Sequence, residues 1–319
     1  MTFLRQASSH LTDATTCALL NLAQWRHRSQ TVTLQQLHAY VATCSAIDRP
    51  AFYAAPALRP GEESPGHLRW TSPYPLGFAA NDEACALLFE GPRGWSAPTV
   101  LILHALMSVN DIGYRRLASR FNDLGWNAAF LHLPFHYARR PRGYLNGELA
   151  ITADLVRNGG ALRQGVTELR QLMAFLRTRG CGEFGLFATS YGAWTGAVLA
   201  SLEQDLSFLA LLVPITDTQH AIWQSPAGLT IRGLLQRNGI DESMTGQHAH
   251  LSSPLHGLPS TDRSRIVLVA GAYDRIAPPD RVEALATAWG GARVIASPQG
   301  HFGYVGTRDL FAAVREMIA

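Results

Sequence analysis

Three residues suited to nucleophilic catalysis follow one another along the chain in the order serine, aspartate, histidine. Ser190 stands between an apolar run and a segment rich in Ala, Leu and Gly. Asp274 follows a second apolar run, and His301 lies in the glycine-bracketed loop 300–303. A serine hydroxyl is a poor nucleophile at neutral pH unless a base takes its proton, and that base is usually a histidine oriented by a carboxylate. The three residues therefore predict acyl transfer through a covalent acyl-enzyme.

Small residues surround Ser190, with Ala188 two positions before it and Gly192 two positions after it. A nucleophile on a sharp strand-to-helix turn requires them, because its strained backbone leaves no room for larger side chains. Such a turn places the Tyr191 N–H at the start of the helix, where it can donate to a developing oxyanion. The alternative is that Ser190 only caps this helix, since serine is a favoured N-cap residue.

Two aspartates are candidates for the carboxylate that orients the histidine. Asp274 lies in the turn Gly271-Ala-Tyr-Asp-Arg-Ile-Ala-Pro278, whereas Asp217 follows the preceding apolar run. An aspartate after a strand is also often a turn former. We favour Asp274, because a turn that ends at a proline suits a fixed orienting group better.

The elements that must position these residues alternate between strands and helices. Continuously apolar runs such as 100–103, 209–213 and 266–269 are typical of strands buried on both faces of a parallel sheet. The strand-like runs are 68–71, 84–90, 99–104, 127–133, 184–188, 208–215, 265–270 and 292–297. The helical patterns among the later strands are 114–124, 165–179, 193–202, 280–289 and 305–318. This alternation predicts an α/β fold with a mostly parallel, eight-stranded sheet flanked by helices.

The rest of the chain predicts an extension and two insertions. Apolar residues at helical spacing over 12–44 predict one or two amphipathic helices, and a segment dense in Pro and Gly follows them. We therefore expect a helical extension and wrapping linker over 1–67 and a catalytic domain over 68–319. The intervals 134–165 and 217–264 are too long for simple connections, and we expect them to form pocket walls or a lid.

From about residue 68 to the C-terminus the chain resembles the α/β-hydrolase superfamily. The resemblance rests on the order Ser190, Asp274, His301 and on the contexts Gly271-x-x-Asp274-x-x-x-Pro278 and Gly300-His301-Phe302. Within the superfamily, Leu131-His-Leu-Pro-Phe135 followed by Arg139-Arg-Pro141 is most similar to an esterase-like branch. The resemblance implies an α/β-hydrolase fold and hydrolysis of a small acyl substrate without a metal or organic cofactor. It also implies that Ser190 is the nucleophile, His301 the base and Asp274 the acid.

The same resemblance places the second oxyanion donor in the loop His104-Ala-Leu-Met107. By similarity this donor is the backbone N–H of Leu106, with Tyr191 supplying the other. Ala105 and Ala188 both stand where the family usually has glycine. Loss of one such donor costs about 3 kcal/mol of transition-state stabilisation. We expect His104 to hold this loop in place rather than to act chemically.

Several residues are further candidates for substrate contact because the pattern places them near the pocket. Each also has a plainer interpretation, as a loop histidine, a solvated arginine or a core aromatic residue. The candidates are His104, Ala105, His136, Arg139, Trp194 and Trp223.

Composition excludes several other classes of function. The net charge of +3 over 319 residues gives no reason to expect a nucleic-acid partner. The four cysteines lack metal-ligand spacing, and His248-Ala-His250 with His256 contains no HExxH pattern, so we expect no metal site. We find neither a signal-peptide pattern nor an apolar run long enough to span a membrane, and we expect a cytoplasmic protein. Whether the chain forms a homodimer is left open.

Several activities share this catalytic machinery. Thioesterases, lactonases, peptidases and acyltransferases all use a Ser-His-Asp arrangement, so the residues alone do not separate them from a carboxylesterase. A hydrolase-like binding protein without activity is an alternative of a different class. We take a serine hydrolase of carboxylic esters as the leading interpretation.

Overall fold

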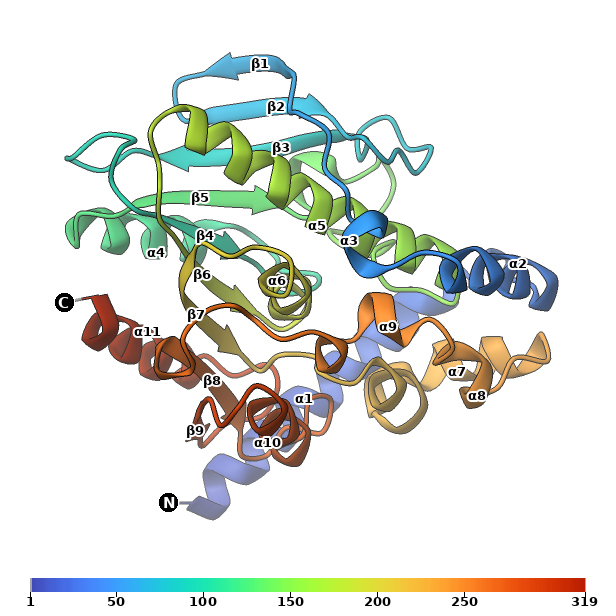
Figure 1. Ribbon diagram of the computed structural model, residues 1–319. Helices are drawn as coiled ribbons and strands as arrows, with labels where there is room; N and C mark the ends of the chain where they lie inside the picture. Colours follow the sequence, from blue (N-terminus) through green and yellow to red (C-terminus); the bar gives the residue numbers. More distant parts are fainter. Residues whose placement is uncertain (1, 319) are drawn as a thin grey trace.

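A nine-stranded sheet runs through the computed structural model, which describes residues 2–318 (Figure 1). The strands lie in the order β1-β2-β3-β5-β4-β6-β7-β8-β9. Their bounds are β1 Pro60–Ser64, β2 His67–Thr71, β3 Glu83–Phe89, β4 Thr99–Leu103, β5 Asn127–His132, β6 Phe184–Thr189, β7 Leu206–Leu212, β8 Ile266–Gly271 and β9 Arg293–Ser297. The pairs that join β1, β2, β3 and β5 are antiparallel, and the pairs from β5 through β4 to β9 are parallel.

The sheet confirms the predicted mostly parallel architecture and contains one strand more than the sequence predicted. The additional strand is β1, which pairs antiparallel with β2 and lies within the segment expected to be a linker. Proline and glycine begin this strand, and both are uncommon in strand interiors. An edge position tolerates them, because one side of the strand needs no partner.

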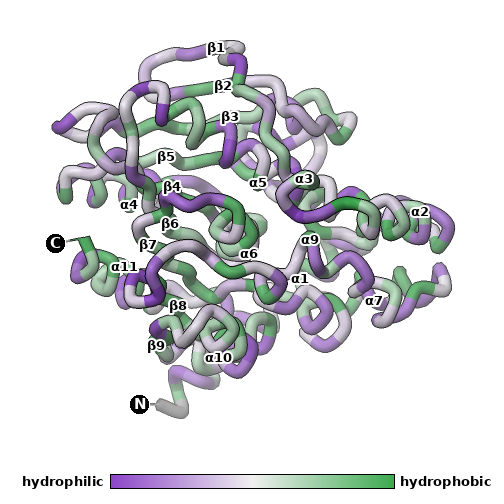
Figure 2. The backbone as a smooth tube through the Cα atoms, in the orientation of Figure 1, coloured by the Kyte–Doolittle hydropathy of each residue, from purple (hydrophilic) through white to green (hydrophobic). Residues whose placement is uncertain are grey.

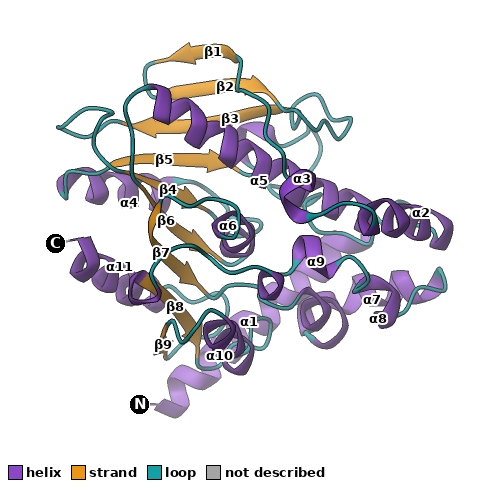
Figure 3. Ribbon diagram, viewed as in Figure 1, coloured by secondary structure: helices purple, strands orange, loops and turns teal. Residues whose placement is uncertain are grey.

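Helices cover both faces of the sheet (Figure 3). Along β4, Leu101 and Leu103 point into one core, and Val100 and Ile102 point into the other. The first core includes side chains of α5 (Leu155–Thr178), α6 (Tyr191–Ala200) and α10 (Pro279–Ala288). The second core includes side chains of α4 (Ile112–Asp123) and α11 (Val305–Ile318). Strands buried on both faces explain the continuous apolar runs, and Figure 2 shows hydrophobic residues concentrated in the central strands and α6.

The N-terminal helices pack against the segment inserted after β7. These helices are α1 (Thr2–Trp25), α2 (Leu34–Ser45) and α3 (Arg49–Phe52). The Asn21 side chain joins α1 to the insertion, because it donates to the Pro226 carbonyl at 2.9 Å and accepts from the Thr230 N–H at 2.7 Å. A third apolar cluster includes residues of α2, α5 and the insertion. Residues far apart in sequence therefore form one wall beside the sheet.

Both predicted insertions contain short helices. The segment after β5 has a 3-10 helix at Tyr137–Arg139. The segment after β7 contains a π-helix at His220–Gln224, α7 (Leu229–Arg237), α8 (Glu242–Thr245), α9 (Ala249–Ser252) and 3-10 helices at Pro226–Gly228, Pro254–His256 and Arg263–Arg265. Among residues 2–318, no helix combines the length and the apolar character that crossing a membrane requires.

Candidate active site

Ser190 lies at a sharp turn between β6 and α6. Its φ of 52° and ψ of −114° lie outside the regions that L-residues commonly adopt. Such strain costs on the order of 1–3 kcal/mol and is found where function requires it. The Ser190 N–H donates to the Leu212 carbonyl at 2.8 Å, which fixes the turn against β7. The Ser190 side chain makes no capping hydrogen bond to α6, so the plainer interpretation as an N-cap does not fit.

Gly192 allows the turn to approach the neighbouring strand. A Cβ atom at this position would lie 2.5 Å from the His104 carbonyl oxygen and 2.8 Å from the Leu103 carbonyl carbon. Both are backbone atoms, which cannot rotate away as a flexible side chain could. A glycine two positions after the serine is therefore required by packing, as the sequence pattern predicted.

Ser190, His301 and Asp274 are joined in series by hydrogen bonds. Ser190 Oγ lies 2.8 Å from His301 Nε2, and His301 Nδ1 lies 2.7 Å from Asp274 Oδ2. All three side chains are buried. The other oxygen of Asp274 accepts from the N–H groups of Ile276 and Ala277 at 2.8 and 2.9 Å. These bonds fix the position of the carboxylate beside the imidazole.

The electrostatic surroundings of His301 favour its protonated form. Burial lowers the pKa of His301, and the charge and hydrogen bond of Asp274, together with the charge of Asp13, raise it. The net result is a pKa above the ordinary value. A histidine in this setting is a strong base toward the serine hydroxyl, and the imidazolium that forms is stabilised by two carboxylates.

Asp217, the alternative acid, lies in other contacts. Its carboxylate is 3.3 Å from Arg281 Nη1 and accepts from the His220 N–H at 3.0 Å. It therefore caps the start of the π-helix after β7 and faces an arginine of α10. The geometry of the described residues favours Asp274 as the partner of His301.

Tyr191 and Leu106, the two predicted oxyanion donors, both line the cavity beside Ser190. Tyr191 is the first residue of α6, where N–H groups have no partner within the helix. In the loop after β4, the Ala105 N–H donates to the Tyr114 hydroxyl at 3.0 Å and the Met107 N–H donates to His136 Nε2 at 3.3 Å. Leu106 lies between them, and among residues 2–318 its N–H has no hydrogen-bond acceptor.

His104 supports this loop from behind. Its Nε2 accepts from the Leu133 N–H at 3.0 Å, and its Nδ1 lies 3.0 Å from the Ala105 carbonyl. Burial lowers the pKa of His104 well below its usual value, so the ring is neutral and can donate at Nδ1 while accepting at Nε2. His104 thus connects the loop after β4 with the end of β5.

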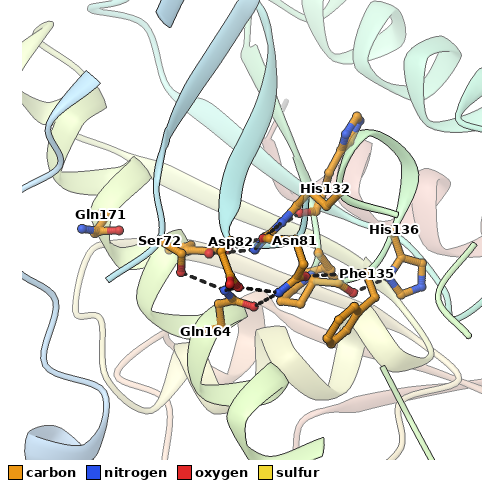
Figure 4. Close-up of polar contacts among 12 residues, drawn as sticks. Ser72, Asn81, Asp82, His132, Phe135, His136, Gln164 and Gln171 are labelled. Atoms are coloured by element: carbon orange, nitrogen blue, oxygen red, sulfur yellow. Dashed lines mark hydrogen bonds and ion pairs between the residues drawn. The ribbon is translucent and has the colours of Figure 1, made fainter. Parts of the chain in front are cut away.

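Arg139 corrects one of the predicted substrate contacts. Its guanidinium is fully buried and lies 2.5 Å from a Glu168 oxygen, with further bonds to the Asn81 and His132 carbonyls. Asn81 is itself fixed by Gln164 at 2.8 Å and by the Phe135 N–H at 2.7 Å (Figure 4). Arg139 therefore holds the segment after β5 together, and its donors do not reach the cavity. The sequence showed a run of arginines but not which of them faces inward.

The other candidates divide into cavity-lining residues and supporting residues. Ala105 and Trp194 line a cavity of about 670 Å³ together with Leu106, Ser190, Tyr191 and His301. His136 is buried behind the loop, where it accepts from Met107 and lies 2.8 Å from the Pro134 carbonyl through Nδ1. Trp223 packs in the third apolar cluster and donates to Thr245 Oγ1 at 2.8 Å. Neither lines the cavity, which corrects both predictions.

Sequence reasoning missed the contribution of α1. Thr12, Thr16, Leu20 and Gln24 recur every four residues and form one wall of the cavity. On the same helix, Asp13 is buried and accepts from the N–H groups of His301 and Phe302 at 2.9 and 3.2 Å. The four-residue spacing was the only available signal, and it equally describes a helix that packs on a core.

The three histidines of residues 248–256 do not form a metal centre. His250 Nε2 lies 3.3 Å from the Ile47 carbonyl, and His248 lines the cavity. Within residues 2–318 no group of three or more His, Cys, Asp or Glu side chains is arranged to hold a metal ion.

Comparison with known proteins gives a fold and two sequence relatives. No family model matches the chain. Two uncharacterized proteins of Mycobacterium tuberculosis, from strains CDC 1551 / Oshkosh and H37Rv, are each 27% identical over 256 residues, which is 79% of this chain. The chain spans about three fifths of their length, 59% in each case.

Solved structures of esterases resemble the chain over most of its length. Acetyl xylan esterase 1 from Thermoanaerobacterium sp. JW/SL YS485 is similar with a TM-score of 0.57 and 13% identity, over 91% of this chain and 100% of that one. An acetyl xylan esterase from Paenibacillus sp. R4 gives a TM-score of 0.57 and 13% identity, over 90% and 99%. An esterase of Pyrococcus furiosus is similar with a TM-score of 0.52 and 12% identity, over 82% of this chain and 96% of that one. Together with the mostly parallel sheet and the serine turn after β6, these likenesses show that the chain has the α/β-hydrolase fold.

Proposed function

We propose that the chain is a serine hydrolase that cleaves carboxylic esters through a covalent acyl-enzyme. One observation carries the proposal: Ser190 Oγ, the His301 imidazole and the Asp274 carboxylate are connected at 2.8 and 2.7 Å at the edge of a cavity. These distances lie within the range for productive proton transfer. The esterases among the structural neighbours support the same class of reaction.

The reaction follows from these contacts. His301 Nε2 takes the Ser190 proton as Oγ attacks the acyl carbon, and Asp274 stabilises the imidazolium. The N–H groups of Tyr191 and Leu106 donate to the oxyanion of the tetrahedral intermediate. His301 then protonates the leaving alcohol, and the bond between the acyl carbon and that alcohol breaks. A water molecule, deprotonated by the same histidine, attacks the acyl-enzyme and releases the acid.

A fluorophosphonate reagent tests the proposal, because it phosphonylates only a serine that a neighbouring base activates. We expect a single adduct on the wild-type protein, at Ser190 by peptide mass spectrometry, together with turnover of aryl esters. Ser190→Ala is expected to lose both. Ser243→Ala is a matched control, because Ser243 lies exposed on α8 and bonds Asp241. It is expected to keep both.

Two outcomes would contradict the proposal. The first is an absence of adduct and turnover in wild-type protein whose circular dichroism shows it to be folded, and this outcome would favour the binding protein. The second is equal ester turnover by Ser190→Ala and wild type. Parallel assays with thioesters, lactones and peptide amides distinguish the related activities that share this mechanism.

A further inference from the structure

Apart from the imidazole of His301, the cavity beside Ser190 is lined by neutral side chains. No Asp, Glu, Lys or Arg side chain contributes to it among residues 2–318. Its aliphatic lining residues include Leu20, Leu155, Leu162, Ile222 and Ile231. Ligand pockets of this kind select mainly by apolar contact and by shape. A charged group placed inside would lose its hydration without gaining an ionic partner.

The lining residues range from fully buried to almost fully exposed. Leu162 of α5 and Ile231 of α7 are 1% and 3% exposed, whereas Val109 and Tyr304 are 92% and 89% exposed. The exposed residues belong to the loops after β4 and β9, and Tyr304 follows His301 by three positions. The cavity thus has a mouth near the His301 loop and a closed end between α5 and α7.

Helix α1 runs along the cavity between these two ends. Asp13 binds the His301 loop at one end, and Gln24 Nε2 donates to the Ile151 carbonyl at 2.5 Å at the other. The lining residues Thr12 and Gln24 are twelve positions apart, which corresponds to roughly 18 Å along a helix. Leu20 lies between them on the same face.

The direction of proton transfer orients an ester in this cavity. Because His301 gives its proton to the leaving alcohol, the alcohol must lie on the side of His301, where the mouth opens. The acyl group then extends toward Leu162 and Ile231. We infer that the closed end of the cavity binds the acyl part of the ester. The acyl chain beyond the ester carbonyl is then uncharged, apolar and longer than that of an acetyl group. This inference rests on the proposed function and specifies its substrate class.

The cavity volume agrees with such an acid. If each non-hydrogen atom of an acyl group occupies about as much space as a water molecule, an acetyl group fills roughly 100 Å³ and an octanoyl group roughly 270 Å³. The cavity of about 670 Å³ accommodates the longer group and leaves room for the alcohol. An acetyl group would leave most of the apolar lining without a contact.

A series of p-nitrophenyl esters tests the inference, from acetyl through butanoyl and hexanoyl to octanoyl. Each buried methylene group is expected to raise kcat/KM about threefold to fourfold until the closed end is reached. We therefore expect octanoyl to exceed acetyl at least tenfold. The p-nitrophenyl monoester of octanedioic acid matches the length of the octanoyl ester but ends in a carboxylate. We expect it to react at least tenfold more slowly than the octanoyl ester, because the carboxylate would enter the closed end of the cavity, away from His301 and among neutral side chains.

Substitutions on α1 test where the acyl chain lies within the cavity. Leu20→Trp fills the passage toward Ile151 and is expected to lower the octanoyl-to-acetyl ratio of kcat/KM at least tenfold. Leu19→Trp is the matched control, since Leu19 is the adjacent residue and its side chain is 62% exposed. It is expected to leave the ratio unchanged. If the tryptophan at position 20 prevents folding, Leu20→Ala is expected instead to move the preferred acid to a longer chain.

The outcomes separate this inference from the proposed function. A preference for acetyl, or equal rates for the octanoyl ester and its carboxylated counterpart, would overturn the inference while leaving an active serine hydrolase. An unchanged ratio in both Leu20 variants would overturn the placement of the chain along α1. Absence of turnover together with absence of a fluorophosphonate adduct would overturn the proposed function, and the inference with it.

Discussion

The carboxylate of Asp13 accepts hydrogen bonds from the N–H groups of His301 and Phe302, although 288 positions separate Asp13 from His301. The two bonds measure 2.9 and 3.2 Å, and the carboxylate is buried. Asp13 therefore fixes the backbone that carries the imidazole, while Asp274 fixes the ring itself. The histidine is held by two carboxylates that lie far apart in the sequence.

Asp13→Asn is expected to shift the pH dependence of the reaction. Asparagine keeps one acceptor oxygen but removes the negative charge, which contributes to the raised pKa of His301. The base must be neutral to act, so activity falls as the pH drops through this pKa. A lower pKa moves the acid limb of kcat/KM to lower pH, and the loss of one bond lowers the plateau, by about tenfold.

The neighbouring thiol of Cys17 does not obscure this shift of the acid limb. Burial raises the pKa of Cys17 to about 11, so the thiol stays neutral across the assay range. Asp48→Asn serves as the control, because Asp48 caps α3 and asparagine caps equally well. An acid limb that does not move in Asp13→Asn, while the plateau falls, would show a role for Asp13 in structure alone.

The choice between the two aspartates is open to a direct comparison. Asp274→Asn is expected to lower kcat about 10⁴-fold, because an amide no longer holds the imidazole in the tautomer that accepts the serine proton. Asp217→Asn weakens only a partly exposed contact with Arg281, so a change within about twofold is expected. Steady-state kinetics and circular dichroism of both variants decide the question. The reverse order of damage would assign the acid to Asp217.

His104 offers a test of the oxyanion loop. His104→Phe removes the acceptor of the Leu133 N–H and the donor to Ala105, and both bonds fix the segment that carries Leu106. If the Leu106 N–H stabilises the transition state, kcat is expected to fall about 10²-fold or more with little change in KM. His38→Phe on the exposed face of α2 is the control. A variant of His104 that changes only KM, or only the melting temperature, would contradict this role.

The buried pair of Arg139 and Glu168 is expected to affect stability. Removing one partner, as in Arg139→Met or Glu168→Leu, leaves the other charge buried and unpaired, which costs about 3–5 kcal/mol in the free energy of unfolding. The double variant is expected to lose less than either single variant, because no unpaired charge remains. Urea unfolding followed by circular dichroism measures all three. Losses that simply add would show that the two residues act independently.

The sequence predicts those parts of the site that depend on local backbone. The turn at Ser190 and the Asp274 turn follow from small residues and prolines within a few positions, and so does the loop of His301. Parallel strands bring the carboxyl ends of β6, β8 and β9 to one edge, so the order of these residues was enough to place them together. The catalytic roles, the domain boundary at residue 67 and the cytoplasmic location stay predictions.

The parts that could not be predicted depend on contacts between distant segments. Arg139 lies in the segment after β5 and Glu168 lies on α5, so the two meet only in the folded chain, and the run of arginines does not show which of them is buried. Similarly, α1 shows an ordinary four-residue periodicity, and nothing in that spacing says that the helix packs on the His301 loop. In both cases the contact partner, rather than the residue itself, decides the role.

The contact between α1 and the His301 loop also sets an order of events during synthesis. At about 5–20 residues per second, the ribosome needs about 15–60 s between residues 13 and 301. Throughout that interval Ser190 is either not yet made or lacks His301 as its partner. The arrangement of Ser190, His301 and Asp274 is therefore complete only after the loop of His301 has been made and has met the helix that carries Asp13.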